Sequence, residues 1–136
     1  MKSILFFLGA VVAIVSSCGK NTPESAEETL PTGTVVVNGN FISNGHPTSG
    51  SVKVIMETGG KRFLVFENFR SDNGPDLRVW LSPNTNGSPY QEIGTLKAVN
   101  GNFSYELNPS VNFTTHNWVL IWCIDFSVLF GHAVLQ

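Results

Sequence analysis

The sequence offers few groups that could perform chemistry. It contains two cysteines in 136 residues, Cys18 and Cys123. It lacks a nucleophile elbow, a phosphate-binding loop, paired zinc-binding cysteines and a His-Glu-x-x-His motif. No nucleophile stands in a recognisable pairing with a general base, so the sequence does not predict a hydrolase or a transferase.

Charge and long apolar runs are also scarce. Charged residues make up 13% of the chain, and the formal net charge is −2. There is no basic stripe that could neutralise phosphates, which argues against nucleic acid as a partner. The amino-terminal apolar stretch, residues 4–15, is shorter than the roughly 20 residues that a membrane-spanning helix needs. No later run approaches that length, so we expect the remainder to be soluble.

The amino terminus has the features of an export signal. Lys2 precedes the apolar stretch, as is typical of secretory signal peptides. Residues 15–19, Val-Ser-Ser-Cys-Gly, resemble the bacterial lipobox, in which the cysteine is acylated and becomes the first mature residue. The resemblance predicts a lipoprotein signal peptide at residues 1–17 and a lipid, including palmitate, on Cys18. The alternative is an ordinary signal peptide followed by an unmodified cysteine.

The lipid determines the expected location of the protein. Acyl chains on Cys18 would hold it on a membrane of the bacterial cell envelope, the outer membrane rather than the inner, without spanning it. Residues 19–33 are polar, acidic and poor in large apolar side chains. Such a stretch buries too little surface to offset its ordering entropy, so we expect residues 18–33 to form the lipidated cysteine and a flexible tether.

From residue 34 onward the sequence has the pattern of a β protein. Short runs rich in Val, Ile, Phe, Tyr and Trp alternate with clusters of Gly, Pro, Asn and Ser, and Gly59-Gly60 is typical of a tight hairpin. No window has a helical apolar stripe, and there is no internal repeat. We therefore predict one domain at residues 34–136, an all-β, single antiparallel β-sandwich of about eight strands, with a closed barrel as the alternative. The strands are expected near residues 34–38, 51–58, 62–67, 76–82, 92–98, 103–107, 117–124 and 127–135.

Cys123 is the residue of greatest chemical interest. With Cys18 lipidated, no partner remains for an internal disulfide, and a free thiol in an oxidising envelope is uncommon. Strand alternation places Cys123 on one face with Val119 and Ile121, while Leu120 and Trp122 lie on the other. Because both faces are apolar, this should be a central strand. Cys123 is then either a small buried apolar residue or a reactive thiol.

Three segments resemble the DM-thirteen (electron transfer DM-thirteen) domain family. The first is Trp-Cys-Ile-Asp-Phe-Ser-Val-Leu-Phe-Gly at residues 122–131, and the second is Asn68-Phe69 followed by Gly-Pro-Asp at residues 74–76. The third is His-Pro-Thr-Ser-Gly-Ser-Val at residues 46–52. The resemblance implies a β-rich fold and a redox role centred on Cys123. It also singles out the Gly-Pro-Asp turn, and His46 with Gly50.

These residues lead to a hypothesis about the site. His46 or Asp76 could converge on Cys123 and make it a partly exposed, reactive thiol. The alternatives are that His46 hydrogen-bonds the backbone of its own turn and that Asp76 caps local amides. The three tryptophans, Trp80, Trp118 and Trp122, are expected in the core; if exposed, they would indicate a binding face.

The sequence requires no cofactor and predicts no metal site. A copper or zinc site made of Cys123, His116 and His132 is chemically permissible, but nothing in the spacing demands it. A group of oxygen-bearing side chains lacks the spacing of an EF-hand calcium site. Its members are Glu67, Asp72, Asn73 and Asp76.

Two classes of function remain open. The first is a redox or electron-transfer module that acts through Cys123 with a partner protein. The second is a non-catalytic envelope module that binds a protein or small ligand and in which Cys123 is structural. The oligomeric state stays open in both.

Overall fold

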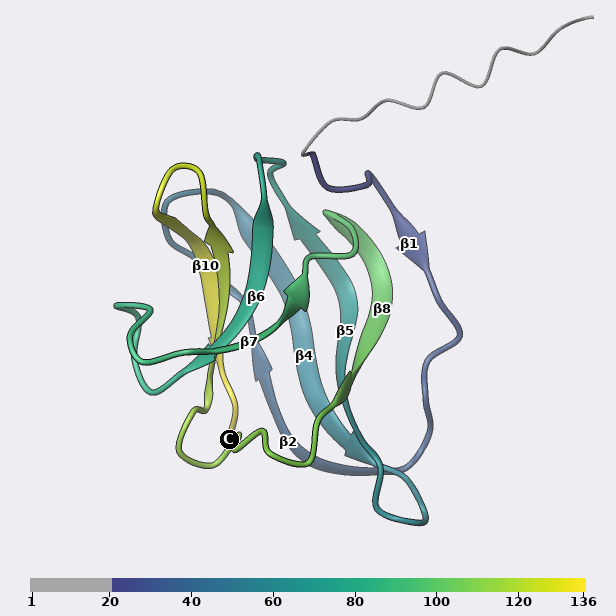
Figure 1. Ribbon diagram of the computed structural model, residues 1–136. Helices are drawn as coiled ribbons and strands as arrows, with labels where there is room; N and C mark the ends of the chain where they lie inside the picture. The colour runs from purple at the N-terminus through teal and green to yellow at the C-terminus, as the bar shows by residue number, and fades with distance from the viewer. Residues whose placement is uncertain (1–20) are drawn as a thin grey trace, which may run out of the picture.

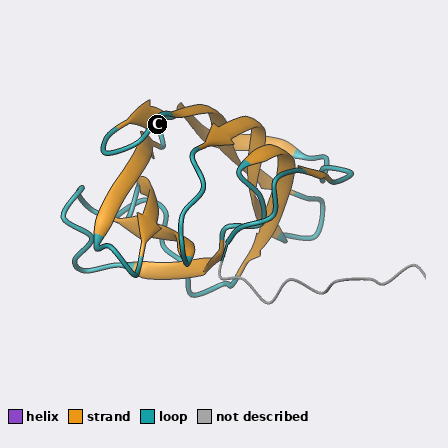
Figure 2. Cartoon of the chain, turned by 90° about the horizontal axis from the view of Figure 1, so that it is seen from above, coloured by secondary structure: helices purple, strands orange, loops and turns teal. Residues whose placement is uncertain are grey.

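The computed structural model describes residues 21–136 of the chain, and β-strands are the regular elements found there. The predicted signal peptide and the predicted lipid site Cys18 lie outside the described residues. Ten strands form two five-stranded sheets that pack as two layers (Figures 1 and 2). The strands are β1 (Ala26–Glu27), β2 (Thr34–Asn40), β3 (Ile42–Ser43), β4 (Thr48–Met56), β5 (Arg62–Ser71), β6 (Leu77–Ser82), β7 (Gln91–Thr95), β8 (Asn100–Leu107), β9 (Trp118–Cys123) and β10 (Val128–Val134).

The all-β prediction is confirmed, and each of the eight expected strands overlaps an observed one. The two additional strands, β1 and β3, have two residues each and pair at sheet edges. Such short strands have no periodicity from which they could be recognised. They form because a partner strand offers free backbone groups, which is a property of the tertiary structure.

The first sheet has the order β1-β8-β5-β4-β2. Its strands pair antiparallel except for β1, which runs parallel to β8. The predicted tight turn joins β4 to β5, and both of its glycines, Gly59 and Gly60, have positive φ (103° and 95°). Residues with a side chain rarely adopt this conformation, which explains the glycine pair.

The second sheet has the order β3-β10-β9-β6-β7, so β9 is its central strand, as predicted. Val119, Ile121 and Cys123 of β9 belong to the core between the sheets. The intervening Leu120 and Trp122 therefore lie on the outer face. This alternation separates the Cys123 side chain from the aromatic surface of the same strand.

The core is rich in phenylalanine. The Phe66 ring lies 4.9 Å from that of Phe103 and 5.3 Å from that of Phe69, and all three side chains have no exposed surface. Burying a side chain of this size contributes about 1.5–3 kcal/mol, so this cluster is a main source of stability.

Part of the expected tether is docked on the domain. Asn21 forms an isolated antiparallel bridge with Pro75, and β1 pairs with β8. Burial by itself raises the pKa of Glu28, but its hydrogen bonds from the Ser104 amide and the Lys97 ammonium group together hold that pKa below the ordinary value. The flexible tether was predicted from the low apolar content of the segment alone. In the structure, hydrogen bonds and an ion pair hold this segment on the domain.

The described chain begins at the end of the sandwich that carries the β9–β10 hairpin, and the carboxyl terminus lies toward the opposite end (Figure 1). Within residues 21–136, no helix has the length and hydrophobicity needed to cross a membrane.

Candidate functional site

Cys123 is the last residue of β9 and is completely buried. It lies between Leu77 of β6 and Val128 of β10 in the sheet register. Its thiol donates a hydrogen bond to the carbonyl oxygen of Pro75, with Sγ and O 3.1 Å apart. The hypothesis of a partly exposed thiol is therefore wrong: the sulfur is buried in the core and bonded to the segment that precedes β6.

That segment contains the Gly-Pro-Asp turn at residues 74–76. Asp76 has a positive φ of 59°, and its carbonyl oxygen accepts a hydrogen bond from the amide of Ile124 at 3.1 Å. Its carboxylate accepts from Nε of Arg78, which also donates to Glu92. The hydrogen bond to Asp76 is the main cause of a raised pKa of Arg78. Asp76 thus touches the Cys123 loop through its backbone, while its carboxylate is bound to arginine.

His46 contacts the ring of Phe130, which in turn lies against the Gly-Pro-Asp turn. Its imidazole stacks on Phe130, with ring centroids 3.9 Å apart, and its Nδ1 lies 3.0 Å from Oδ2 of Asp72. Phe130 is buried, and a Cβ placed on Gly74 would lie 2.9 Å from its Cζ. Only a glycine lets the turn approach the ring this closely. The hydrogen-bond partner of the His46 imidazole is the Asp72 carboxylate rather than the backbone of its own turn.

The structure therefore links the three segments through a chain of contacts that ends at one thiol. We call the group the motif cluster. It consists of His46, Asp72, Gly74, Pro75, Asp76, Cys123 and Phe130. Phe130 did not stand out in the sequence as a site residue, and Asp72 was considered only among the oxygen-bearing side chains of the calcium hypothesis. The sequence signal for their place in this cluster is membership of the Phe-Gly segment and of the segment from Asn-Phe to Gly-Pro-Asp.

Gly50 has a different role. Its φ is +103°, and a Cβ there would lie 2.6 Å from the carbonyl oxygen of Asn68 in the adjacent strand. The backbones of β4 and β5 approach each other at an irregularity in their register, so Gly50 serves strand pairing.

The structure does not assemble the metal sites considered above. In residues 21–136, no three side chains of His, Cys, Asp or Glu lie together in a way that could hold a metal ion. His132 bonds to Asn44, and His116 bonds to Thr115. The four oxygen-bearing side chains of the calcium hypothesis have separate partners. Glu67 pairs with Lys53, Asp72 with His46, Asn73 with the backbone of Thr22, and Asp76 with Arg78.

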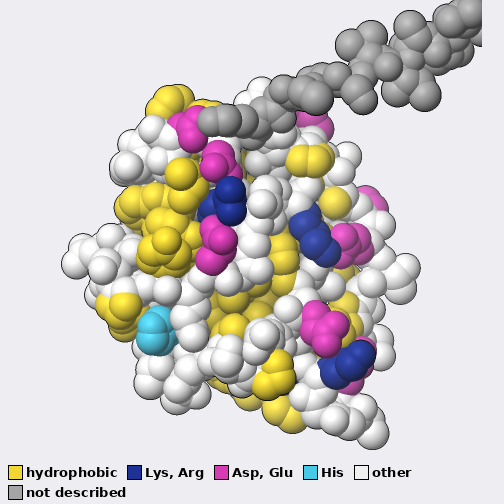
Figure 3. All heavy atoms as spheres, viewed as in Figure 1, with side chains coloured by type: hydrophobic (Ala, Val, Ile, Leu, Met, Phe, Trp, Pro, Cys, Tyr) yellow, Lys and Arg dark blue, Asp and Glu magenta, His cyan; other side chains and the backbone are white. Residues whose placement is uncertain are grey.

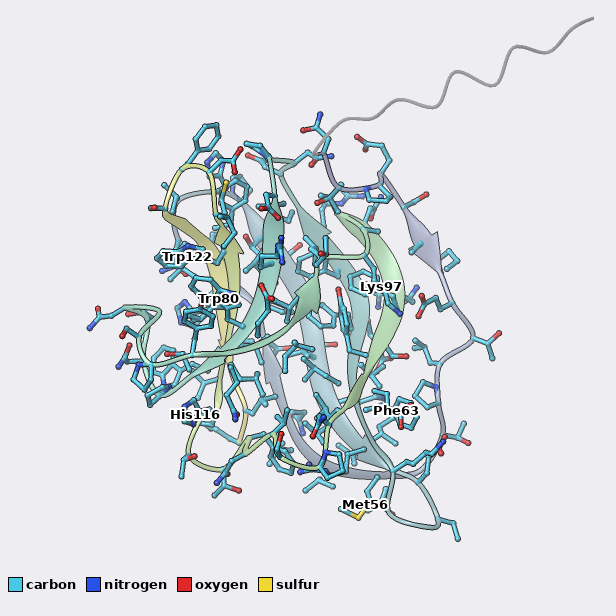
Figure 4. The ribbon with its side chains drawn as sticks, viewed as in Figure 1. Met56, Phe63, Trp80, Lys97, His116 and Trp122 are labelled. Atoms are coloured by element: carbon cyan, nitrogen blue, oxygen red, sulfur yellow. The ribbon has the colours of Figure 1, made fainter. Side chains whose placement is uncertain are left out.

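A second feature is an aromatic stack on the outer face of the second sheet. The ring centroids of Tyr90 and Trp80 are 3.8 Å apart, with an interplanar angle of 11°. Those of Trp80 and Trp122 are 5.0 Å apart, with an interplanar angle of 16°. Figure 4 shows the two labelled tryptophans side by side, and Figure 3 shows hydrophobic surface on this side of the molecule. Trp80 is buried beneath the half-exposed Tyr90, whereas its neighbours Val79 and Leu81 belong to the core between the sheets.

The prediction of core tryptophans is confirmed for the burial of Trp80 and is wrong for Trp118 and Trp122, which are partly exposed. Trp80 and Trp122 are on the outer face, and Trp118, also partly exposed, lies 5.0 Å from the His132 ring. Strand alternation could have indicated the outer face for Trp122, because it places Trp122 on the side opposite Cys123. Both faces of β9 are apolar, so composition alone did not separate them.

A family model described as Electron transfer DM13 matches residues 40–135 of the chain. This range contains every member of the motif cluster and the aromatic stack. No curated protein and no solved structure gives a match.

Proposed function

Because the chain belongs to the Electron transfer DM13 family, we propose that it is an electron-transfer module of the bacterial cell envelope with Cys123 as its redox group. The family supports the electron-transfer role. The assignment to Cys123 rests on the motif cluster, and the location rests on the lipobox.

The observation that carries the assignment is the chain of contacts that links the three motifs and ends at one thiol. Cys123 bonds to Pro75 of the Gly-Pro-Asp turn, and Phe130 packs against Gly74 of that turn. His46, from the third motif, stacks on Phe130. Segments that are far apart in the sequence thus meet where the one described thiol lies.

The closed arrangement determines how such a thiol can react. The sulfur is fully buried and bonded to the Pro75 carbonyl, so a partner reaches it only after a local opening, for which movement of the turn at residues 74–76 is the proposed route. The thiol then loses its proton to solvent, and its sulfur forms a bond to one sulfur of a partner disulfide. The other sulfur leaves as a thiolate and takes up a proton, which gives a mixed disulfide with electrons and atoms in balance.

The proposed location follows from Cys18. The lipobox resemblance supports acylation of this residue, which anchors the domain on the outer membrane of the envelope. A disulfide-bearing envelope protein is then the partner class that Cys123 meets, because disulfides persist in that compartment.

Glutathione disulfide is a suitable probe of the proposed chemistry. We expect the folded protein to take up one glutathione on Cys123, detected by intact mass and reversed by a reductant, with an unchanged circular dichroism spectrum. Cys123→Ser is the control and should show no adduct. A wild-type protein that remains unmodified while folded would contradict the redox role of Cys123.

A second candidate function is supported by the aromatic stack. In a ligand-binding module, Cys123 would be structural, as its complete burial and its bond to Pro75 allow. Tyr90 is 49% exposed and presents one ring face of the stack to solvent. An unreactive thiol, together with quenching of tryptophan fluorescence by a bound ligand, would favour this function over the first.

A further inference from the structure

The loop between β9 and β10 exposes two large apolar side chains. Phe126 is 62% exposed and Ile124 is 38% exposed, and they flank Asp125 at the tip of the hairpin. Phe126 is the most exposed large hydrophobic residue in the described chain. Nothing in the motif cluster requires these side chains to face solvent, because the contacts of the loop with Asp76 are made by its backbone.

The start of the described chain lies at the same end of the sandwich. Asn21 pairs with Pro75, the next residue Asp76 accepts the amide hydrogen bond of Ile124, and Phe126 is two residues further. These direct contacts connect the amino-terminal segment to the apolar hairpin tip. Figure 1 shows the hairpin and the start of the described chain at one end of the molecule.

The segment is held there by side-chain bonds as well. The amide oxygen of Asn73 accepts from the Thr22 amide at 3.1 Å, and its nitrogen donates to the Thr22 carbonyl at 2.7 Å. Thr22 itself is buried, and the Pro23 carbonyl accepts from the amide of Val99. The domain therefore does not swing freely about residues 21–23.

The sequence places the lipid site three residues before this docked segment. Three residues reach about 11 Å when fully extended, so a lipid on Cys18 brings the membrane to the end where Asn21 is held. The opposite end, with the β4–β5 turn, then faces away from the membrane.

We propose that the tip of the β9–β10 hairpin inserts into the bilayer on which the protein is anchored, through Phe126 and Ile124. This inference rests on the lipid anchor of the proposed function. Two apolar side chains at an exposed tip suit the headgroup–acyl boundary, where they leave water while the backbone of the loop stays solvated.

The attraction is apolar rather than electrostatic. The hairpin tip and the turn at residues 72–76 carry three aspartates and no lysine or arginine. Anionic lipid is therefore not needed, and a zwitterionic bilayer is the partner that fits. Docking through the hairpin and the anchor together limits rotation of the domain and places the Cys123 end of the sandwich beside the membrane.

Depth-dependent quenching of an introduced tryptophan tests the inference. The full chain is expressed, isolated from membranes as the lipidated protein and placed in phosphatidylcholine vesicles with or without lipid brominated on its acyl chains. Phe126→Trp keeps an apolar ring at the tip. Met56→Trp is the control, because Met56 is likewise an exposed apolar residue, with 38% of its surface exposed, and lies beside the β4–β5 turn at the opposite end.

We expect brominated lipid to quench the additional fluorescence of Phe126→Trp and to leave that of Met56→Trp unchanged. Equal quenching of wild-type protein and Phe126→Trp would overturn the inference, because it would place the outer face with Trp118 and Trp122 on the membrane. An unquenched Phe126→Trp would overturn it as well.

The intact mass of the same sample shows whether a negative result counts against hairpin insertion or against the lipid anchor on which it rests. A lipidated mass together with unquenched fluorescence of the Phe126→Trp variant contradicts hairpin insertion and leaves the anchor standing. A mature Cys18 without lipid contradicts the anchor and hairpin docking together.

Discussion

The thiol of Cys123 and the carbonyl oxygen of Pro75 form a 3.1 Å hydrogen bond between the end of β9 and the turn that precedes β6. The bond joins two segments that the family resemblance had singled out separately. The thiol is fully buried in the folded protein, which keeps solutes from the sulfur while the structure is closed. The same turn is the element whose movement would expose the thiol.

Loss of the Arg78 side chain should make Cys123 more reactive. Arg78 binds the Asp76 carboxylate, so Arg78→Met removes one contact that holds the turn in place. An ion pair of this exposure is worth about 0.2–1 kcal/mol, which predicts modification by glutathione disulfide up to about fivefold faster. Lys53→Met is the matched control, because Lys53 forms a similarly exposed pair with Glu67 on the other sheet. Equal rates in both variants would show that Arg78 does not restrain the turn.

The aromatic stack depends on a glycine. Gly87 has φ +70°, and a Cβ there would lie 3.1 Å from the Trp80 ring and 3.3 Å from the Trp122 ring. We expect Gly87→Ala to lower the free energy of unfolding by about 1–3 kcal/mol and to alter the near-ultraviolet circular dichroism of the tryptophans.

Gly60→Ala separates backbone strain from ring contact. Gly60 also has a positive φ, but its added Cβ would meet nothing within 4 Å. The two variants should therefore differ in urea denaturation, with Gly87→Ala the less stable. The same loss of stability in both would mean that the rings accommodate the methyl group.

The docked amino-terminal segment depends on Asn73. Asn73→Ala removes both hydrogen bonds to Thr22 and the one that the Gly74 amide donates. We expect faster amide hydrogen exchange at Asn21 and Thr22 and a loss of about 1–2 kcal/mol in unfolding free energy. Asn73→Asp keeps the accepting oxygen and should have a smaller effect on exchange. Unchanged exchange in Asn73→Ala would show that the segment is held by its backbone contacts with Pro75, Val99 and β8 without Asn73.

His132 gives stability a pH dependence. Burial lowers the pKa of His132 below its ordinary value of 6.5, and its Nδ1 lies 2.6 Å from Oδ1 of Asn44. As the pH falls below 6.5, the unfolded chain binds a proton that the folded protein does not. The contribution of neutral His132 to the free energy of unfolding is therefore fully present above pH 6.5. It declines as the pH falls from 6.5 to the lower pKa that His132 has in the folded protein. His132→Gln should flatten the unfolding free energy over this range, and an unaltered slope would contradict the assignment.

The fold was largely predictable because period-two alternation and turn residues are local signals. Val119, Ile121 and Cys123 alternate with Leu120 and Trp122, and this pattern predicts a central strand correctly. The docking of residues 21–28 was not predictable in this way. It rests on pairs such as Asn21 with Pro75 and Lys97 with Glu28, which only the folded chain brings together.

The sequence identified residues of the site, but it did not predict how they are arranged around the thiol. Cys123, His46 and Asp76 all belong to the motif cluster, yet neither the imidazole nor the carboxylate is the hydrogen-bond partner of the thiol. That partner is a backbone carbonyl, and every residue has one. No residue type in the sequence could therefore indicate it.

In the proposed function, the folded protein exposes Cys123 by movement of the turn at residues 74–76. The rate of Cys123 modification by glutathione disulfide, measured by intact mass at increasing urea concentrations below the unfolding transition, tests it most directly. Local opening exposes little surface, so the account predicts a rate that is nearly independent of urea. A rate that rises with urea in proportion to the globally unfolded fraction would show that Cys123 reacts only after unfolding and would contradict the account.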